Sequence, residues 1–598
     1  MPEYKAPIRD IKFVMQELLD CDRHYQKLGY EDASLDMVDA IISEASKFTE
    51  QIIAPINQIG DEQGCTWTDG EVTTPDGFKE AYQQYVEGGW PTLAQNVDFG
   101  GQGLPHSLNT AINELFSSAN HSFAMYPGLS HGALATIEAH GSDQQKDQFM
   151  PKLVEGNWTG TMCLTEPHCG TDLGMLRTKA ELNDDGSYSL TGTKIFISAG
   201  EHDLSDNIVH IVIARIPGSP EGSKGISLFI VPKFNITDDG EIADRNAVSC
   251  GSIEHKMGIN ANATCVINFD GAKGYLIGEV NRGLNCMFTF MNAARLGVAT
   301  EGVAAAEASF QGALAYAKDR LQMRSLSGVK NPEGPADAII VHPDVRRMLL
   351  TQKSIAEGGR ALIAYLAQLV DIGHASTCEE EKAAAETKLA LLTPIAKAFL
   401  TELGLECTSH GVQVFGGHGF IKEWGMEQLM RDTKISCLYE GTTGIQALDL
   451  LARKILGSKG KILKAFGSEV TKFCLENAED DAMQEFIQPI MSFGGDWQKM
   501  TEKVGERAMK NPDEIGAASV DYLMYSGYLT LAYFWAKMAK VAQDKLANGN
   551  DDEAFYQAKI KTARFYFQRI LPRASGHAAC VENGAESMME LSEDDFSF

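Results

Sequence analysis

Three short runs, SYSLTGTKIFIS (187–198), NIVHIVIARI (207–216) and KGISLFIVPKF (224–234), decide the fold of this 598-residue chain. They are rich in β-branched and aromatic residues, and clusters of Gly, Pro, Asn and Asp separate them, as expected for strands joined by turns. They lie in a region from about 160 to 283, which we predict to be a compact antiparallel sheet or barrel.

Helical patterns flank this region on both sides. Before it, apolar residues between 37 and 53 recur at helical spacing. After it, Ala, Leu and Met dominate three long stretches, and a last segment contains the amphipathic run AKIKTARFYFQRI (558–570). We expect the apolar face of that run to dock on the preceding helices. The predicted fold is therefore α+β, with an N-terminal helical domain (1–159), a middle β domain (160–283), a helical bundle (284–455) and a C-terminal helical extension (456–598).

Composition excludes several classes of function. The net charge is -29, from 52 Lys+Arg and 81 Asp+Glu, which argues against a nucleic-acid partner because phosphate binding needs a basic surface. No run approaches the roughly 18 apolar residues of a membrane span, and the N-terminus has no apolar signal core, so we expect a cytoplasmic protein. The 12 cysteines form no CxxC pair and the 14 histidines no HExxH, so we predict no metal site.

One string, Gly128-Leu129-Ser130-His131-Gly132, fits the GxSxG pattern of serine hydrolases. That motif needs a strand, a sharp turn and a helix within an alternating α/β fold, and no such alternation follows it. We interpret the string as a helix start bounded by Gly and keep a serine hydrolase using Ser130 as a remote alternative.

Two motifs surround the entry to the β region. CLTEPHCGTD (163–172) combines a Thr hydroxyl with a Gly turn, which would let backbone N–H groups approach a polar ring or a phosphate. KIFISAG (194–200) should place Phe196 and Ser198 on one face of a strand. Alone, the first could equally be a solvated loop, and the second is better explained as a core strand.

A third motif joins QVFGGHGFIKEWGMEQLMRD (413–432) to KISCLYEGTTGIQ (434–446). The Gly-Gly pair near a helix end would let the backbone come close to a ligand. Glu440 lies between Tyr439 and Gly441 in apolar surroundings, which suits a carboxylate acting as a base. Without the other motifs, a capping glutamate is an equally good interpretation.

In this order, the motifs resemble the acyl-CoA dehydrogenase family over about residues 35–455. GSDQQKDQFMPKL (141–153), IEHKMGINANATC (253–265) and YAKDRLQMR (316–324) add to the resemblance. The resemblance implies FAD as cofactor and oxidation of an acyl-CoA to its trans-2-enoyl-CoA. Glu440 would take the α proton while the β hydrogen leaves as hydride to flavin N5. The family's alternative place for the base, near Ala293 and Ala294, holds no carboxylate here.

The resemblance also implies roles for other residues. Ser198 stands where the family usually has Thr, Phe196 where Trp is common, and Gly444 where Gln is frequent. Arg320 and Gln322 would reach the FAD of a neighbouring subunit. The implied FAD contacts are Thr165, Phe196, Ser198, Arg320, Gln322, Gln413, Gly416, Gly417 and Thr442. The implied substrate contacts are Thr171, Asn292, Arg295, Tyr439 and Gly441.

The extension from 456 to 598 resembles that of an enlarged bacterial branch, which includes fatty acyl-CoA and 3-methylmercaptopropionyl-CoA dehydrogenases. In that branch the extra domain implies a homodimer, and the electron acceptor is an electron-transferring flavoprotein. We expect a medium- to long-chain fatty acyl-CoA as substrate, with 3-methylmercaptopropionyl-CoA as the alternative. An acyl-CoA oxidase, which passes electrons to oxygen, would share the same base and flavin.

Overall fold

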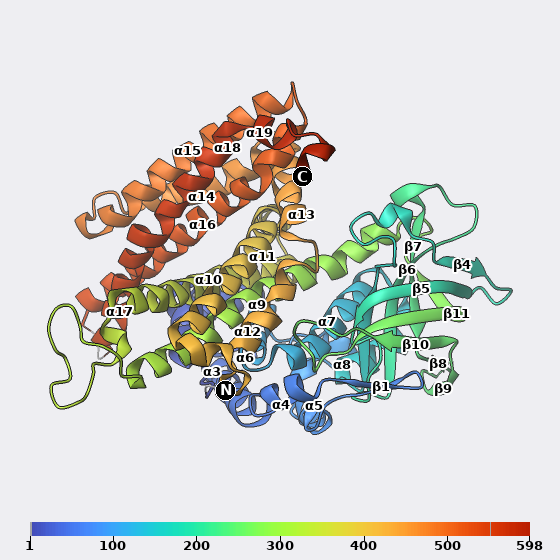
Figure 1. Ribbon diagram of the computed structural model, residues 1–598. Helices are drawn as coiled ribbons and strands as arrows, with labels where there is room; N and C mark the ends of the chain where they lie inside the picture. Colours follow the sequence, from blue (N-terminus) through green and yellow to red (C-terminus); the bar gives the residue numbers. More distant parts are fainter. Residues whose placement is uncertain (1–2, 238, 550–551, 598) are drawn as a thin grey trace. The chain divides into compact units, whose positions relative to one another are not determined.

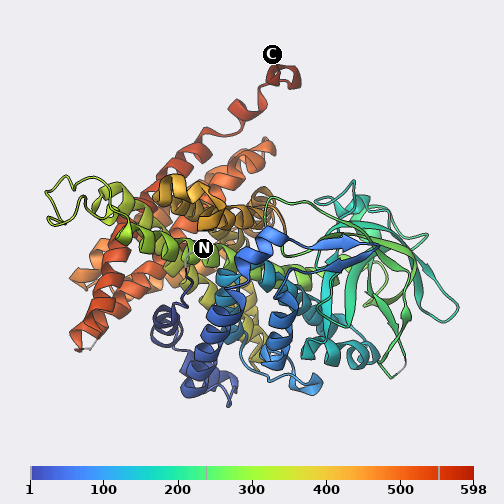
Figure 2. The ribbon, with the colours of Figure 1, turned by 60° about the horizontal axis from the view of Figure 1, so that its bottom comes forward.

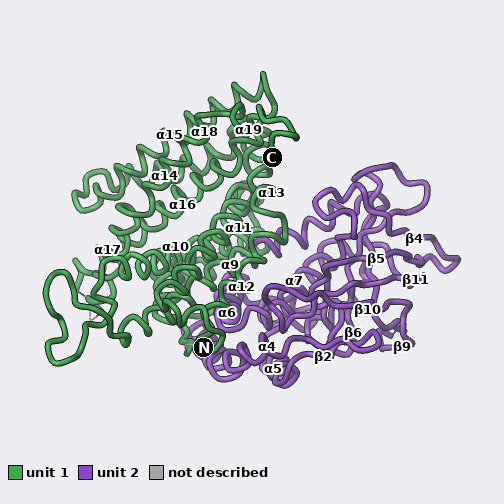
Figure 3. Tube along the Cα trace, in the orientation of Figure 1, with its two compact units in different colours: residues 1–35, 298–598 green, residues 36–297 purple. Residues whose placement is uncertain are grey.

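A computed structural model describes residues 3–237, 239–549 and 552–597, and this part of the chain divides into two compact units (Figures 1 and 3). One unit comprises residues 36–297, and the other combines 1–35 with 298–598. The helix α9 (Gly283–Asp319) includes the boundary between them.

The first unit begins with helices: α3 (Leu35–Phe48), α4 (Asn57–Gln63), α5 (Phe78–Glu87), α6 (His106–Ala119), α7 (His121–His140) and α8 (Asp143–Glu155). Helix α8 starts where a capping box predicts it, since Ser142 and Gln145 exchange side-chain and backbone hydrogen bonds. A small hairpin, β1 (Thr66–Thr68) and β2 (Glu71–Thr73), interrupts the helices. Its Asp69-Gly70 turn has positive φ at both residues, the typical signal for a tight hairpin, in a region that we expected to be helical.

The predicted β region is present and forms a closed ring of strands in this unit (Figure 2). The strands are β3 (Trp158–Cys163), β4 (Lys179–Leu182), β5 (Tyr188–Ser198), β6 (Asn207–Arg215), β7 (Ile226–Pro232), β10 (Val248–Ile253) and β11 (Thr264–Ile277), with β8 (Phe234–Ile236) and β9 (Ile242–Arg245) as a separate hairpin. They run in the order β10-β11-β5-β4-β6-β3, and β7 pairs with both β11 and β6, which closes the ring. Most pairs are antiparallel, but β3 and β4 pair with β6 in parallel, as the long connections between these strands allow.

Strands β6 and β7 are buried on both faces, which explains their continuous apolar sequences. Alternate residues enter two different cores. On β6, Ile211 and Ile213 pack in the core formed with α7, α8 and the first turns of α9, which includes Phe149 and Phe290. Val212, on the other face, packs in the core inside the ring of strands.

The second unit is helical. Its helices are α1 (Ile8–Lys12), α2 (Cys21–Leu28), α10 (Pro343–Ala375), α11 (Glu379–Phe415), α12 (Met426–Lys434), α13 (Thr443–Leu448), α14 (Lys461–Glu476), α15 (Gln484–Ala508), α16 (Asp513–Ala547), α17 (Glu553–Phe565), α18 (Ala574–Asn583) and α19 (Glu586–Met589). The extension docks on the bundle, as predicted. The indole of Trp535 on α16 donates to the Ser354 carbonyl on α10 at 3.0 Å. A Cβ at Gly527 would lie 2.2 Å from the ring of Phe399 on α11, so the two helices meet at a residue without a side chain.

The amphipathic run behaves as expected. Phe567, Ile570 and Leu571 are buried, and Phe565 is partly buried. The extension and the bundle therefore share one core within this unit.

Buried charges also join the extension to the rest of the second unit. Lys559 on α17 donates to Asp10 on α1 and, at 2.7 Å, to Glu357 on α10. Arg360 donates to Asp10 and, at 2.8 Å, to Glu307. Burial alone raises the pKa of Asp10, but the positive charges of Lys559 and Arg360 prevail and hold it below its ordinary value. The cluster joins four helices, α1, α9, α10 and α17, through paired charges.

We expect Lys559→Met to destabilise this unit strongly. Removing Lys559 leaves Asp10 with Arg360 and Glu357 with Lys353 as their remaining positive partners, and breaking a buried ion pair in this way costs about 3–5 kcal/mol. Lys540→Met is the matched control, because Lys540 pairs with Asp544 at the surface of α16, where such a pair contributes about 0.3–0.5 kcal/mol. Urea unfolding followed by circular dichroism measures both.

The same cluster gives a pH dependence. Because the folded-state pKa of Asp10 lies below its ordinary value of 3.8, its contribution is complete above that pH and is lost as the pH falls below it. The stability difference between wild type and Lys559→Met should therefore shrink on acidification below about pH 4. Equal urea midpoints for the two proteins at neutral pH would contradict the assignment.

Candidate active site

Glu440 lies in a tight turn between α12 with its following turn, Ile435–Cys437, and α13. Glu440 and Gly441 have φ of 55° and 90°, so both adopt the left-handed conformation. For glutamate this conformation costs roughly 1–2 kcal/mol, and such strain persists only where the surroundings impose it. The Glu440 side chain is half-buried.

Buried side chains hold the carbonyls of this turn. Gln446 Nε2 donates to the Glu440 carbonyl at 2.8 Å, and Lys397 Nζ donates to the Gly441 carbonyl at 2.7 Å. Both side chains are fully excluded from solvent. A Cβ at position 441 would lie 2.6 Å from Gln446 Nε2, so this position requires glycine for space as well as for conformation.

The residue before Glu440 is held by a second carboxylate. The Tyr439 hydroxyl donates to Glu301 at 2.5 Å, and Ser436 donates to the same oxygen at 2.7 Å. Burial, with the negative charge of Glu301, raises the pKa of Tyr439 well above its ordinary value, so the phenol stays neutral and acts as a donor. After Glu440, Thr442 caps α13 by accepting the Ile445 N–H at 3.3 Å. The structure thus brings the predicted residues Tyr439, Glu440, Gly441 and Thr442 into one constrained turn.

In the other unit, the structure brings Thr165, Phe196 and Ser198 together. The Ile195 N–H donates to the Thr165 carbonyl at 2.9 Å, which joins the CLTEP segment to β5. The pairing of β5 with β11 shifts at this point, and Phe196 has φ of 60°. This bulge turns Phe196 outward, leaving it 58% exposed, while Ser198 is partly buried. Simple strand alternation therefore does not describe this segment.

The neighbouring Glu166 anchors the loop that carries Thr165. It pairs with the fully buried Lys194 at 2.9 Å and accepts the backbone N–H groups of Arg177 and Thr178 at 2.7 and 3.0 Å. Although burial opposes it, the charge of Lys194 and these hydrogen bonds lower the pKa of Glu166 to about 2.

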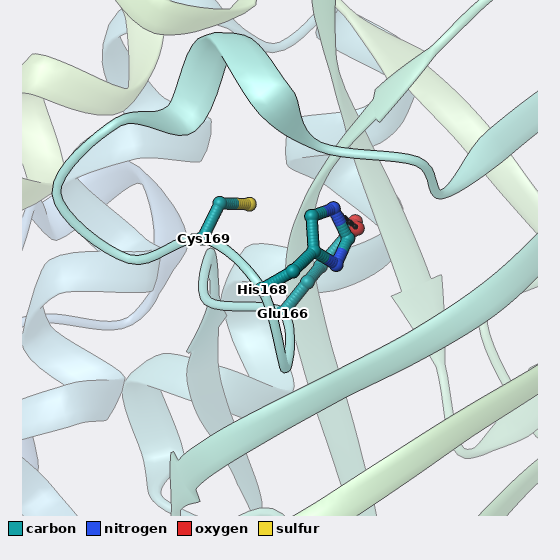
Figure 4. A group of neighbouring side chains, drawn as sticks. All are labelled: Glu166, His168 and Cys169. Carbon is teal, nitrogen blue, oxygen red and sulfur yellow. Dashed lines mark ion pairs between the residues drawn. The ribbon is translucent and has the colours of Figure 1, made fainter.

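Figure 4 shows Glu166 with His168 and Cys169, whose possible metal-ligand atoms lie within 4.8 Å of one another. The His168 Nε2 atom also lies 2.9 Å from the Met175 carbonyl, which it meets as a donor. Because the buried lysine already neutralises Glu166, we assign this group to loop structure and not to metal binding.

Several predicted FAD contacts lie at one end of the second unit. The Tyr316 and Phe415 rings stack with centroids 4.1 Å apart, which places the end of α9 beside the end of α11. Arg320 and Gln322 follow Tyr316 at the start of a loop. Gln413, Gly416 and Gly417 lie around the end of α11. Like Arg320 and Gln322, these three residues are exposed.

The predicted substrate contacts of the first unit are divided. On α9, Arg295 Nη1 donates to Asn292 Oδ1 at 3.4 Å, so these two residues are neighbours. Arg295 is 9% exposed and Asn292 is exposed. Thr171 lies in the exposed part of the loop after Glu166.

Ser130 does not occupy a nucleophile elbow. It lies in the interior of α7, away from any strand-to-helix turn and also not at a helix start, which corrects our interpretation of the GxSxG string. Its hydroxyl is buried and bonded on both sides, since it accepts the Gly160 N–H at 3.0 Å and donates to the Tyr126 carbonyl at 3.4 Å.

Comparison with known proteins identifies the family. Four family profiles match in succession: the acyl-CoA dehydrogenase N-terminal domain (37–157), middle domain (161–272) and C-terminal domain (281–456), and the acetyl-CoA dehydrogenase C-terminal-like domain (466–592). A 3-methylmercaptopropionyl-CoA dehydrogenase of Ruegeria pomeroyi is 41% identical over 98% of this chain and 100% of its own. The chain belongs to the acyl-CoA dehydrogenase family. It is thus an oxidoreductase that acts on CH–CH donors.

Two further relatives extend this result. A broad-specificity linear acyl-CoA dehydrogenase of Mycobacterium tuberculosis is 33% identical over 99% of this chain and 100% of its own. The fold also matches the crystal structure of an acyl-CoA dehydrogenase from Bacillus anthracis complexed with FAD, with a TM-score of 0.75 and 21% sequence identity. The match covers 95% of this chain and 90% of the Bacillus anthracis chain. Among the described residues, no helix of the dehydrogenase is long and apolar enough to cross a membrane.

The motifs alone assigned no role at the Glu440 turn to Lys397, Glu301 or Gln446, although Gln446 is the last residue of KISCLYEGTTGIQ. Lys397 gave a usable signal, because a lysine inside the apolar run LLTPIAKAFL (391–400) is rarely buried without a specific partner. Gln446 and Glu301 gave none, because their contacts arise only from the fold.

Proposed function

We propose that this enzyme oxidises an acyl-CoA thioester to its trans-2-enoyl-CoA, with Glu440 as the base that removes the α proton. The observation that carries the proposal is the strained turn at Glu440. The carbonyls of Glu440 and Gly441 accept hydrogen bonds from two fully buried side chains, Gln446 and Lys397. A base whose backbone is held in this way has less freedom to lose when it is aligned with its substrate.

Glu440 contributes in two ways in this proposal. Its carboxylate takes the α proton, a role that typically contributes about 10²–10⁴-fold to the rate. Its backbone N–H donates to the thioester carbonyl, which stabilises negative charge as the proton leaves. Tyr439 and Gly441 would line the substrate beside it.

The residues present fit FAD as the cofactor. The exposed Phe196 ring would offer an aromatic surface, and the Thr165 and Ser198 hydroxyls, on a segment and a strand joined by a backbone hydrogen bond, would offer hydrogen-bonding groups, which together suit a flat, polar ring system. The exposed Arg320 and Gln322 offer donors for a pyrophosphate. Gln413, Gly416, Gly417 and Thr442 would complete the FAD contacts. When bound, FAD accepts the two electrons that leave with the β hydrogen.

The acyl group has two candidates. A straight-chain fatty acyl-CoA of medium to long length follows from the resemblance, and the linear acyl-CoA dehydrogenase relative at 33% identity supports it. The 41% identity to a 3-methylmercaptopropionyl-CoA dehydrogenase favours the thioether substrate. In both cases Thr171, Asn292 and Arg295 would contact the CoA part, because it is common to the two substrates.

We also propose a homodimer and an electron-transferring flavoprotein as electron acceptor. In a dimer, Arg320 and Gln322 would reach the FAD of the second subunit. The apolar face of the extension is already used inside its own unit, so it does not offer a surface for further association.

The visible spectrum of the purified protein tests this proposal. We expect a yellow protein whose flavin band bleaches without oxygen when its substrate is added, because electrons from the acyl group reduce the cofactor. A panel of butyryl-, octanoyl-, palmitoyl- and 3-methylmercaptopropionyl-CoA, compared by single-turnover rate, identifies the acyl group. Peroxide formation in air at the turnover rate would indicate an oxidase, and a colourless protein that FAD does not bind would contradict the proposal.

A further inference from the structure

Two buried side chains, Lys397 and Gln446, donate hydrogen bonds to consecutive carbonyls of the turn that carries Glu440. We propose that they are positioning residues: they hold the backbone of Glu440 in its left-handed conformation and so set the place from which its carboxylate reacts. This inference rests on the proposed role of Glu440 as the base.

The conformation of Glu440 needs an external restraint. With φ of 55°, a glutamate pays the steric cost of the left-handed region, and a free turn would relax toward a right-handed or extended conformation. That relaxation rotates the peptide between Glu440 and Gly441, so the Glu440 carbonyl must leave Gln446 Nε2. The two hydrogen bonds therefore oppose the motion that would displace the base.

Helix α11 supplies the rigid support. Lys397 on this helix holds Gly441, and Glu402 on the same helix accepts the Thr443 hydroxyl at 2.6 Å. The turn is thus attached to one long helix on both sides of Thr442. An ammonium group excluded from water is strongly unfavourable unless it is compensated, and the Gly441 carbonyl at 2.7 Å supplies part of this compensation.

Within the described part of the chain, only one end of the Gln446 amide is hydrogen-bonded. Its Nε2 meets the Glu440 carbonyl, while its buried Oε1 has no hydrogen-bond partner among the described residues. A buried acceptor without a partner is unfavourable, so the place of this glutamine is better explained by its bond to the Glu440 carbonyl. Its amide is also packed against the Cα of Gly441, where any side chain would collide with it.

The test uses Gln446→Met and Lys397→Met in the full-length, FAD-loaded enzyme. We expect Gln446→Met to lower kcat about 10- to 100-fold with unchanged KM and flavin content, because a displacement of the base by about 1 Å costs about 10²-fold. Lys397→Met should act in the same direction. Should it fail to fold, Gln446→Met and the shorter Gln446→Asn carry the test.

Gln352→Met is the matched control. Gln352 is also fully buried in this unit, donates to the Met348 carbonyl at 3.2 Å and accepts from Ser309 at 2.7 Å, but it lies on α10 away from the turn. We expect it to lower the unfolding midpoint while kcat stays within about twofold, since it removes two hydrogen bonds of ordinary strength without moving Glu440. A merely structural role for Gln446 would give the same result as this control and would overturn the inference.

A double-variant cycle separates this inference from the proposed function. If Gln446 acts through Glu440, then Gln446→Met should cause little further loss of single-turnover rate when Glu440 is already Gln. A full additional 10-fold loss in that background would overturn the positioning role while the base assignment stood. Normal turnover by Glu440→Gln alone would instead refute the proposed function, from which this inference follows.

Discussion

Glu440→Gln should bind FAD and acyl-CoA normally and lose about 10²–10⁴-fold in the rate of flavin reduction, the range that a general base contributes. The amide is nearly the same size as the carboxylate, so the contacts of Gln446, Lys397 and Glu301 with the turn remain. It cannot accept the α proton. Stopped-flow measurement of the flavin band under anaerobic conditions gives the rate directly.

Glu427→Gln is the control for this experiment. Glu427 lies on α12 ahead of the turn and pairs with Arg431 on the same helix, so its loss should leave the rate unchanged. If Glu440→Gln kept more than about a tenth of the normal rate, well outside the range for loss of a base, the assignment would be wrong.

The sequence predicted the α+β architecture because each element is encoded locally. Strand β6 is apolar at almost every position because both faces are buried, and turn residues bound it on either side. The closure of the ring was not predictable, because it depends on β7 pairing with β11 and β6 at once. The β1–β2 hairpin was missed because its strands are short, although its Asp69-Gly70 turn was a valid signal.

The candidate site was predictable only where residues adjacent in sequence form it. Tyr439, Glu440, Gly441 and Thr442 share one turn, and one motif contains them all. Lys397, in contrast, lies 44 positions from Gly441, and only the packing of α11 brings the two together. The outward orientation of Phe196 depends on a shift in the pairing of two strands, which strand alternation cannot reveal.

Truncation after residue 455 should yield a chain that aggregates or fails to fold. The truncated bundle would lose the fully buried Trp535 ring, which packs on α10 and donates a hydrogen bond to the Ser354 carbonyl. It would also lose Arg573, which donates to Glu406 on α11 at 2.8 Å, and Lys559, which neutralises Asp10 and Glu357. Exposed apolar surface and the loss of one positive partner from several carboxylates would result together, and either one destabilises a folded chain by several kcal/mol.

A shorter truncation, after residue 585, is the control. It removes α19, whose residues are exposed, and keeps the Lys503–Glu582 ion pair and the donation from Arg507 to the Val581 carbonyl. Circular dichroism should therefore find this variant folded, and light scattering should find it in the same oligomeric state as the full-length enzyme. The variant ending at 455 should form large particles or lose helicity. A monodisperse, helical protein ending at 455 would mean that the bundle folds without the extension. Without Lys559, Asp10 would then be neutralised by Arg360 or exposed to solvent.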